Sequence, residues 1–379
     1  MWVVFMEPSK KLYPLQFKEI IRSYEVGGTK IQDKYNKNLP EDGKIAETWE
    51  ISDHDADISI VSNGPFSGKH LRGLIWEFKE ELLGDRVYSK FGMRFPLLVK
   101  FIDATENLTV QMHPDDELAH KLNLDHNGKA EVYYILEAEK DSVIYWGCKE
   151  GVTETEMIQA VQTGNGLELA KEIPVQSGDT IFVPPKWVHA IGEGNLVLEI
   201  QQNADITFEP TRVKKTIQDK TYELFHGKEA ENIFTDHMLI RSVDSSEAKI
   251  PSITTQEDKN KRKLLFASNY FALESLILEG PWDISLDGEN FVVLNVVKGS
   301  GSIDYRYGDT NFEEGDTILI PAGMSDFTIE PTTNSQVLKT FIPDLKADIF
   351  DPLKKRGVSE KTIVRLGGYR EFNDLLSFL

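Results

Sequence analysis

Cysteine is almost absent from this sequence of 379 residues, because Cys148 is the only one. A single cysteine excludes an intramolecular disulfide and a cysteine-rich zinc site, so any metal must be held by His, Asp, Glu or Gln. The same scarcity fits a reducing compartment. The hydrophobic content of 40% and aromatic content of 10% are sufficient for a core that needs no covalent cross-link.

Long apolar runs are also missing. The opening segment MWVVFMEP has only about six apolar residues and no basic residues before them, which is too short for a secretory signal. No other stretch approaches the roughly 18 apolar residues that a membrane-spanning helix needs. We therefore expect a soluble cytoplasmic protein without a membrane partner.

Positive charge is scarce, with 42 Lys and Arg against 62 Asp and Glu and a formal net charge of −20. Nucleic acids and anionic membranes are recognised by clustered cations, so we expect neither as a partner. An anionic small substrate would need a local cationic pocket. Single Lys and Arg residues near a candidate site are therefore important candidates for binding such a substrate.

Short runs rich in β-branched and aromatic residues, separated by Gly, Pro, Asn and Asp turns, extend through most of the chain. Residues 95–104 and 131–138 are examples. Helical periodicity is confined to short segments and to the C-terminus. The pattern predicts a mostly β sandwich or barrel with small helical insertions and a helical C-terminal tail.

Two stretches repeat each other. GDTIFVPPKWVHAI begins at Gly178, and GDTILIPAGMSDFTI begins 137 residues later at Gly315. The eleventh residue after the glycine is His189 in the first copy and Asp326 in the second. This spacing of Gly-Asp, Pro and His resembles the second motif of the cupin superfamily, whose fold is a small β-barrel that often holds a metal. The resemblance implies two cupin-type β-barrels of the double-stranded β-helix kind.

The repeat and a polar segment suggest four regions. We expect an N-terminal metal-binding domain over residues 1–226, a linker over 227–263, a metal-free second cupin domain over 264–343 and a helical tail over 344–379. The tail's apolar positions at helical spacing favour packing on the body or on another subunit over a catalytic role.

Four residues of the first half form a candidate metal site. On an extended strand Gln111 and His113 share a face, and Lys129 and Glu131 share another by the same alternation. Adding His189 gives a nitrogen and oxygen ligand set suited to Zn²⁺ or a similar divalent ion, with one position open.

Each of these residues also has a simpler interpretation. A lone His on a strand is more often a surface or satisfied core residue, and Glu131 would serve equally well as a solvated side chain. The metal site is favoured because the surrounding runs VYYIL and IFVPPKWVHAI are strongly apolar. An unpaired ionisable group buried there would cost several kcal/mol.

The ordered motifs QMHPDDELA, GKAEVYYIL, VPPKWVHAIGEGNLVLEIQQ, ETWEIS and VGGTK resemble the type I mannose-6-phosphate isomerases, in their short bacterial two-cupin form, over residues 12–343. The resemblance implies one zinc per chain, held by Gln111, His113, Glu131 and His189. It implies interconversion of mannose 6-phosphate and fructose 6-phosphate by proton transfer through an enediol. Lys129 is then a catalytic residue, and Lys100 and Thr109 contact the substrate phosphate. Without the family match, Lys100 would be interpreted equally well as a lysine on an edge strand with its ammonium in solvent.

Several positions depart from that family. After EIQQ the family has Tyr and Arg where this chain has Phe208 and Glu209. An anion there has the wrong sign to stabilise an enediolate. Arg212 is the candidate catalytic residue that would compensate, although Pro210 interrupts the local geometry. Val26 also replaces the family's tryptophan before Gly-Gly.

These departures leave competing functions. An active zinc isomerase is favoured by the intact ligand set and Lys129, whereas Glu209 favours a catalytically altered paralogue that keeps zinc and binds a sugar or sugar phosphate. An Fe²⁺ cupin dioxygenase is disfavoured because Gln111 is a poor ligand for that chemistry. Zinc-bound hydroxide, Lys129 and a nearby carboxylate remain candidates for the carbon base. The exact sugar and the assembly state, with a homodimer among the options, stay open.

Overall fold

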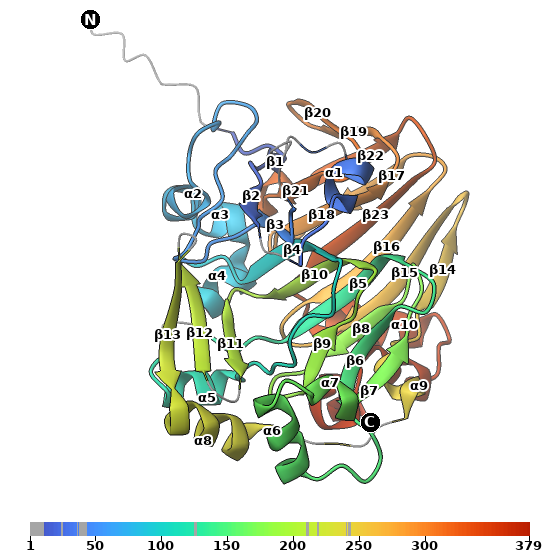
Figure 1. The fold of residues 1–379 in the computed structure, drawn as a ribbon. Helices are drawn as coiled ribbons and strands as arrows, with labels where there is room; N and C mark the ends of the chain where they lie inside the picture. The colour runs from blue at the N-terminus through green and yellow to red at the C-terminus, as the bar shows by residue number, and fades with distance from the viewer. Residues whose placement is uncertain are drawn as a thin grey trace, which may run out of the picture.

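The described part of the chain is mostly β. The computed structural model describes residues 11–23, 26–35, 37, 44–124, 127–209, 212–217, 220–239, 241 and 244–379. Its strands gather into two large groups that lie side by side (Figure 1). Within the described residues, no helix combines the length and apolar character needed to cross a membrane.

The first strand group supplies the candidate site. It contains a six-stranded sheet in the order β2-β3-β4-β10-β5-β8 and a three-stranded sheet in the order β7-β6-β9. The strands are β2 (Ile20–Arg22), β3 (Glu47–Ile51), β4 (Leu97–Ala104), β5 (Glu131–Ala138), β6 (Val143–Cys148), β7 (Ala170–Pro174), β8 (Thr180–Val183), β9 (His189–Ile191) and β10 (Asn195–Gln202).

The second strand group has a seven-stranded sheet in the order β1-β21-β18-β23-β16-β15-β14 and a four-stranded sheet in the order β17-β22-β19-β20. The strands are β1 (Leu15–Gln16), β14 (Ile253–Glu257), β15 (Asn260–Ala267), β16 (Ala272–Leu278), β17 (Trp282–Ser285), β18 (Val292–Lys298), β19 (Gly301–Tyr305), β20 (Gly308–Phe312), β21 (Thr317–Ile320), β22 (Asp326–Pro331) and β23 (Ser335–Phe341). Strand β1 comes from the N-terminal part of the chain, so the two groups share backbone pairing.

A fifth sheet, of three strands, and short helices complete the body. The sheet consists of β11 (Ile206–Glu209), β12 (Arg212–Ile217) and β13 (Lys220–His226). The helices of the body are α1 (Lys30–Tyr35), α2 (Leu71–Phe78), α3 (Glu80–Leu83), α4 (Asp85–Phe91), α5 (Asp116–Lys121), α6 (Glu154–Gln162), α7 (Gly166–Leu169), α8 (Gly227–His237), α9 (Ser245–Ala248) and η1 (Ala322–Met324). The predicted linker 227–263 thus contains α8, α9 and β14, and the four-region division stays a prediction.

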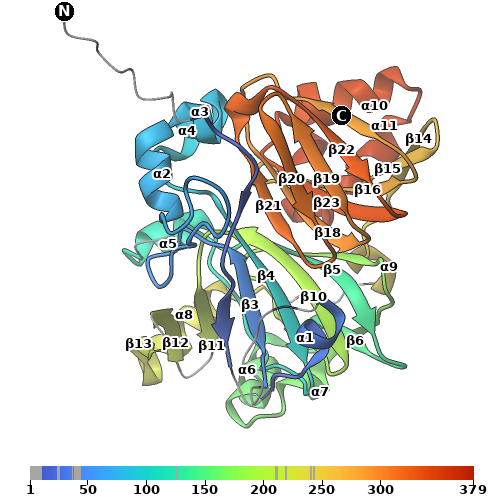
Figure 2. The same cartoon turned by 90° about the horizontal axis from the view of Figure 1, so that it is seen from above.

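The helical tail predicted from the sequence is confirmed. It consists of η2 (Leu345–Phe350), α10 (Asp351–Lys355), α11 (Glu360–Ile363), η3 (Val364–Gly367), η4 (Arg370–Phe372) and η5 (Asp374–Phe378). These short helices lie beside β15 and β16 of the second strand group (Figure 2). Ile349, Ile363 and Leu366 are fully buried in the apolar core of that group, so the tail is part of the folded body.

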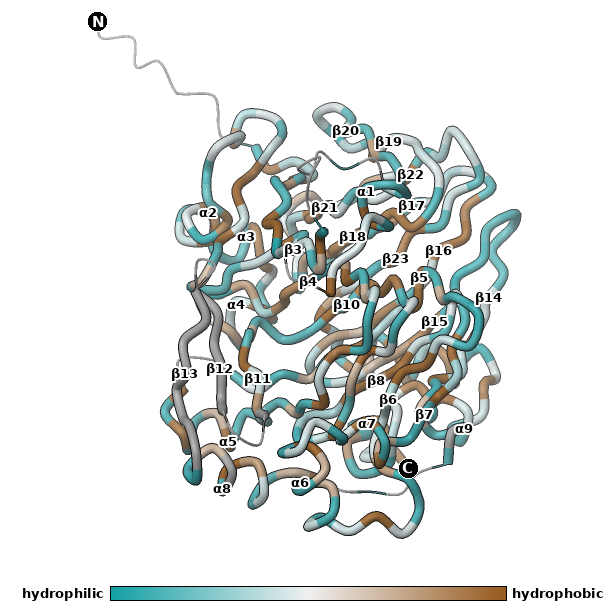
Figure 3. Tube along the Cα trace, viewed as in Figure 1, coloured by the Kyte–Doolittle hydropathy of each residue, from teal (hydrophilic) through white to brown (hydrophobic). Residues whose placement is uncertain are grey.

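One apolar core joins the two strand groups. The rings of Phe95 and Phe291 lie 4.6 Å apart between centroids, and those of Phe182 and Phe266 lie 4.7 Å apart. Hydrophobic residues follow the central strands and hydrophilic residues follow the outer loops (Figure 3). Burial of each such ring contributes about 2 kcal/mol before entropy costs, so the interface holds the two groups in a fixed relation.

The two Gly-Asp-Thr stretches occupy equivalent positions. Gly178 and Gly315 have φ angles of 90° and 94°, a left-handed conformation that favours glycine. Their amides donate to Ile135 and Val296, each at 2.8 Å. Strand β9 then begins at His189, which is fully buried, and β22 begins at Asp326, which is exposed. The same local turn therefore delivers a histidine to the interior and an aspartate to the surface.

Candidate metal centre

Three buried side chains, His113, Glu131 and His189, converge in the first strand group. One possible ligand atom from each lies within 4.8 Å of the others. Glu131 begins β5 and His189 begins β9. His113 follows the extended residue Gln111, whose amide and carbonyl exchange 3.0 Å hydrogen bonds with His189. Backbone pairing between two segments distant in sequence thus brings both histidines to one place.

Each imidazole is oriented by a backbone carbonyl. His113 Nδ1 lies 2.7 Å from the carbonyl oxygen of Ile206, and His189 Nδ1 lies 2.8 Å from that of Trp187. A carbonyl only accepts, so Nδ1–H donates and Nε2 keeps its lone pair. The Nε2 atoms of His113 and His189 lie 3.6 and 3.0 Å from Glu131 Oε1. The unprotonated Nε2 atoms of both histidines thus face the Glu131 carboxylate.

Gln111 reaches the same space from the side. Its Nε2 lies 3.5 Å from His189 Nε2, and the side chain is half-buried. A half-turn of the terminal amide would exchange nitrogen for oxygen at that position. The structure therefore brings the four expected ligand residues together.

Lys129 sits beside Glu131 and is almost fully buried. Its Nζ lies 2.6 Å from Glu131 Oε2, 3.2 Å from Glu199 Oε1 and 3.1 Å from His113 Nε2. Burial alone would lower the pKa of Lys129, but Glu131 and Glu199 raise it above its ordinary value. The ammonium therefore stays charged at neutral pH.

Burial and neighbouring charges shift the pKa values of His113, Glu131 and Glu199. Burial, reinforced by the charge of Lys129, lowers the pKa of His113 to about 4, so its ring is neutral near pH 7. Burial by itself would raise the pKa of Glu131, but Lys129 and His113 lower it well below its usual value. Burial raises the pKa of Glu199 to about 8, with Lys129 opposing the shift and Glu131 adding to it. A neutral imidazole and an ionised carboxylate are the forms that bind metal.

Two residues missed by the sequence analysis support Glu131. Tyr133, two residues on along β5, donates its hydroxyl to Glu131 Oε1 at 2.6 Å. Glu199 belongs to β10, where it pairs with Tyr133 across the sheet. Period-two alternation along VYYIL and EIQQ would have placed both on the inward face. Only the strand order shows which carboxylate they meet.

Lys100 lies on β4, an interior strand between β3 and β10, and is only 3% exposed. Its Nζ is 3.6 Å from Glu47, 3.7 Å from Glu199 and 3.5 Å from Asp205. The position is therefore not that of an edge-strand lysine with a solvated ammonium. Three carboxylates already surround the charge.

The buried charges are those that a divalent cation would complement. The cluster is formed by four carboxyl groups and two ammonium groups, those of Glu47, Glu131, Glu199, Asp205, Lys100 and Lys129. With Glu199 mostly protonated near pH 7, three carboxylates still exceed two ammonium groups. Two imidazole nitrogens and one carboxylate oxygen, with the Gln111 amide, form a donor set typical of Zn²⁺. The residues present therefore fit a bound zinc ion.

The remaining predicted residues are placed only in part. Thr109 is exposed and precedes Gln111 by two residues on the segment that runs along β9. Arg212 begins β12 and faces Glu209 of β11 in the backbone register. The side chains of Arg212 and Glu209 lie outside the described residues, so their distance from the metal centre is not established.

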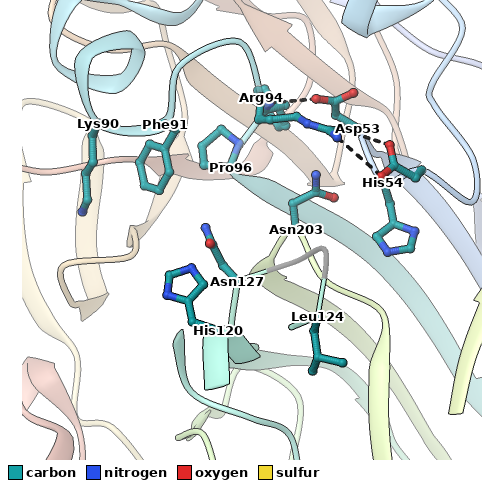
Figure 4. Close-up of a pocket in the computed structure, with 12 residues that line it drawn as sticks. Asp53, His54, Lys90, Phe91, Arg94, Pro96, His120, Leu124, Asn127 and Asn203 are labelled. Carbon is teal, nitrogen blue, oxygen red and sulfur yellow. Dashed lines mark hydrogen bonds and ion pairs between the residues drawn. The ribbon is translucent and has the colours of Figure 1, made fainter. Parts of the chain in front are cut away.

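A pocket of about 320 Å³ lies where β4 begins and β10 ends (Figure 4). Pro96, Asn203, Arg94, Lys90 and His120 are among the residues that line it. Among the described residues that line it, none belongs to the metal centre. Arg94 already pairs with Asp55 at 2.9 Å, which reduces the positive charge offered to a ligand.

Family models match two parts of the chain. Residues 15–144 match phosphomannose isomerase type I, catalytic domain, and residues 260–337 match mannose-6-phosphate isomerase, cupin domain. The chain is 31% identical over 327 residues to mannose-6-phosphate isomerase ManA of Bacillus subtilis, covering 84% of this chain and 96% of that protein. It is 28% identical over 298 residues to the mannose-6-phosphate isomerase of Streptococcus mutans, covering 78% and 88%.

Solved structures agree with these matches. The crystal structure of mannose 6-phosphate isomerase from Bacillus subtilis has a TM-score of 0.72 and 27% identity, covering 86% of this chain and 99% of that one. A mannose 6-phosphate isomerase solved in its zinc-bound form has a TM-score of 0.70 and 15% identity, covering 87% and 99%. At that identity the second likeness concerns the fold.

Proposed function

Since this chain belongs to the type I mannose-6-phosphate isomerase family, we propose that it interconverts mannose 6-phosphate and fructose 6-phosphate at the metal centre around Glu131. The observation that carries the proposal is the buried contact of Lys129 with Glu131 and Glu199, next to two oriented imidazoles. A charged lysine held beside a ligand cluster suits a reaction in which negative charge develops on a sugar oxygen.

We propose that one zinc ion is held by His113 Nε2, His189 Nε2, Glu131 and Gln111. The ion would supply an electrophile that polarises the sugar oxygens. The backbone carbonyls of Ile206 and Trp187 fix the two rings, and the hydroxyl of Tyr133 fixes the carboxylate. These contacts hold the two rings and the Glu131 carboxylate in fixed orientations.

Conversion of mannose 6-phosphate to fructose 6-phosphate requires a proton to leave C2 and a proton to be delivered to C1. The hydroxyl on C2 must also lose its proton, and the oxygen on C1 must gain one. Lys129 is placed to donate to the oxygen on which charge develops, because its ammonium lies at the edge of the ligand cluster. Glu199, 3.2 Å from Lys129, is the nearby carboxylate through which a proton would pass. Arg212 remains a proposed further catalytic residue on the basis of the family resemblance.

Lys100 and Thr109 remain proposed phosphate contacts. The three carboxylates around Lys100 imply that it also holds Glu199 in place. We therefore expect Lys100→Met to lower kcat as well as raise KM, whereas Thr109→Ala should raise KM with kcat nearly unchanged.

The test is turnover of mannose 6-phosphate by zinc-reconstituted protein in D₂O, followed by NMR. We expect fructose 6-phosphate, deuterium at C2 of the recovered mannose 6-phosphate, and loss of both with His189→Ala. Folded protein that holds one zinc per chain yet gives neither product nor exchange would contradict the assignment. That outcome would favour a paralogue that binds a sugar phosphate without converting it.

A further inference from the structure

The two strand groups carry the same buried cluster with its charges reversed. The order β3-β4-β10-β5-β8 of the first group corresponds to β15-β16-β23-β18-β21 of the second. Lys100 of β4 faces Glu199 of β10, and Glu274 of β16 faces Lys339 of β23. The Gly178 and Gly315 turns, which bond to β5 and β18 in the same way, support this alignment.

The third member of each cluster follows the same rule. Glu47 of β3 lies opposite the residue two places after Lys100, and Arg262 of β15 lies opposite the residue two places after Glu274. In the first group Lys100 thus lies between Glu47 and Glu199. The corresponding residue of the second group is Glu274, which lies between Arg262 and Lys339. Arg262 and Lys339 both contact the Glu274 carboxylate, Lys339 at 3.4 Å. We call Arg262, Glu274 and Lys339 the inverted triad.

The inverted triad lines a pocket of about 250 Å³. Glu274 is 1% exposed and shares its face of β16 with Leu276, which belongs to the apolar core of the second group. Trp282 lines the same pocket. The first group places its ligand cluster on one side of its large sheet. The second group has an open pocket on the equivalent side of its own large sheet.

The inverted triad carries a net positive charge that suits an anion. Two cations contact one buried carboxylate, and Nε of Arg262 is buried without a hydrogen-bond partner among the described residues. At the rim Arg356 pairs with Glu257 at 3.2 Å, and Asp283, which accepts from Thr328 at 2.7 Å, keeps its negative charge. An arginine fork and a lysine match the geometry of an oxyanion.

We propose that the inverted triad binds a small oxyanion, the phosphate or carboxylate group of a metabolite, at a site separate from the metal centre. In the first strand group Lys100 lies among carboxyl groups, whereas in the second group the buried carboxylate of Glu274 lies between two half-buried cations that suit an anion. One repeated framework thereby offers two ligand sites of opposite sign.

The test is NMR of protein labelled with ¹⁵N-arginine and titrated with inorganic phosphate and, separately, with succinate. The Nε–H signal of Arg262, assigned with Arg262→Lys, should shift and saturate, whereas that of Arg86, which is held by Asp348 at 2.9 Å, should not. A response to phosphate alone, or to succinate alone, identifies the group. Lys339→Gln should weaken the binding at least about fivefold, or about 1 kcal/mol.

Lys261→Gln is the matched control, because Lys261 is exposed on the same strand as Arg262. If Lys339→Gln does not fold, Arg356→Gln removes a rim cation from an exposed position and should weaken binding by a smaller factor. An Arg262 signal that stays unmoved by both anions, or that moves equally in Lys339→Gln and wild type, would overturn the proposal and leave the triad as an ion pair only.

A second, independent observation concerns the tail. The turn before β9 contacts both histidines of the metal centre: the amide of Lys186 donates to the carbonyl of His113 at 2.7 Å, and the carbonyl of Trp187 accepts from His189 Nδ1. Trp187 is fully buried. The rings of Tyr369 and Phe372 in the tail pack on it, with centroids 5.0 and 6.3 Å away.

From this packing we infer that Tyr369 is a positioning residue, which holds the Trp187 turn and through it both imidazoles. The inference rests on the proposed function, because it treats those imidazoles as zinc ligands. The tail lies beyond residue 337, where the match to the second family model ends. This chain would then stabilise its metal centre with a segment outside the residues that the family models match.

Competition for zinc against a chelator, together with the kinetic constants, tests this inference. Tyr369→Ala should lose zinc at least about tenfold more readily and should lower kcat more than it changes KM, and Tyr369→Phe should restore both. Tyr307→Ala, at a ring that is 53% exposed, is the control. Wild-type zinc affinity in folded Tyr369→Ala would refute the role. The zinc readout stays informative even if the wild type has no isomerase activity.

Discussion

At the scale of single residues, Glu131 is where the contacts of the metal centre converge. His113, His189, Lys129 and Tyr133 all direct a polar atom at its carboxylate. Such a buried carboxylate is stable only when it is paired, and the cost of removing a partner is set by the charge left behind. Substitutions around Glu131 should therefore separate chemistry from metal binding.

Lys129→Met should lower kcat for mannose 6-phosphate by about 100- to 10,000-fold, the usual contribution of a positioned proton donor. The zinc content should stay at one per chain, because the imidazoles keep their carbonyl partners. Steady-state kinetics and metal analysis measure the two effects. Lys140→Met, at an exposed residue, is the control. A variant with kcat within about tenfold of wild type would remove Lys129 from the mechanism.

Cys148 should be chemically inert in the folded protein. Its side chain is fully buried, and burial raises the pKa of the thiol to about 12. Only the thiolate reacts, and at pH 8 it would make up about one part in ten thousand. Iodoacetamide should therefore leave native protein unlabelled and label one thiol per chain in denaturant, as mass spectrometry would show. Rapid labelling of the native protein would be inconsistent with this burial.

At the scale of secondary structure, alternation along strands selects which side chains meet. Residues 129, 131 and 133 project to one side because β5 is extended, and the pairing of β5 with β10 brings Glu199 to the same side. A shift of one residue in that register would move Glu199 to the opposite face. The second strand group uses the same register rule for the inverted triad.

Short connections between elements are as constrained as the strands. Gly84, between α3 and α4, has a φ of 92°, and a Cβ there would lie 2.4 Å from the backbone of Glu289 and Asn290. Gly92 has a φ of 63° with no atom near a Cβ. Gly84→Ala should therefore reduce the free energy of unfolding by at least about 2 kcal/mol more than Gly92→Ala, as measured by urea denaturation. Equal losses would show that the Glu289 loop adjusts freely.

At the scale of the whole molecule, the net charge of the protein opposes the binding of its proposed substrate. The chain carries a net charge of −20, whereas the proposed substrate is an anion. Lys100 and Lys129 are buried among carboxylates and cannot offset the long-range field. Capture of the substrate should then depend on ionic strength.

We expect kcat/KM for mannose 6-phosphate to rise when NaCl increases from about 10 to about 150 mM, because salt screens the repulsion between two negative partners. Initial rates at low substrate concentration measure this directly, and circular dichroism at each salt concentration checks that the fold is unchanged. A steady fall of kcat/KM with salt would mean instead that attraction to local cations dominates the encounter.

Local patterns in the sequence were sufficient to predict the mostly β architecture, the repeat of two Gly-Asp-Thr turns, the helical tail and the candidate ligand residues. These follow from local signals: period-two alternation, turn glycines and ionisable residues within apolar runs. The structure brings Gln111, His113, Glu131 and His189 together, although their metal-binding role remains a proposal.

The distant residues that surround them were found only from the folded arrangement of the strands. Tyr133 and Glu199 meet Lys129 and Glu131 because β5 pairs with β10, a contact between segments about 60 residues apart that no local pattern specifies. Packing of Tyr369 on Trp187 and the reversed charges of the inverted triad arise in the same way. Strand order and packing are set by burial of the whole apolar surface at once, so they appear only when the chain has folded.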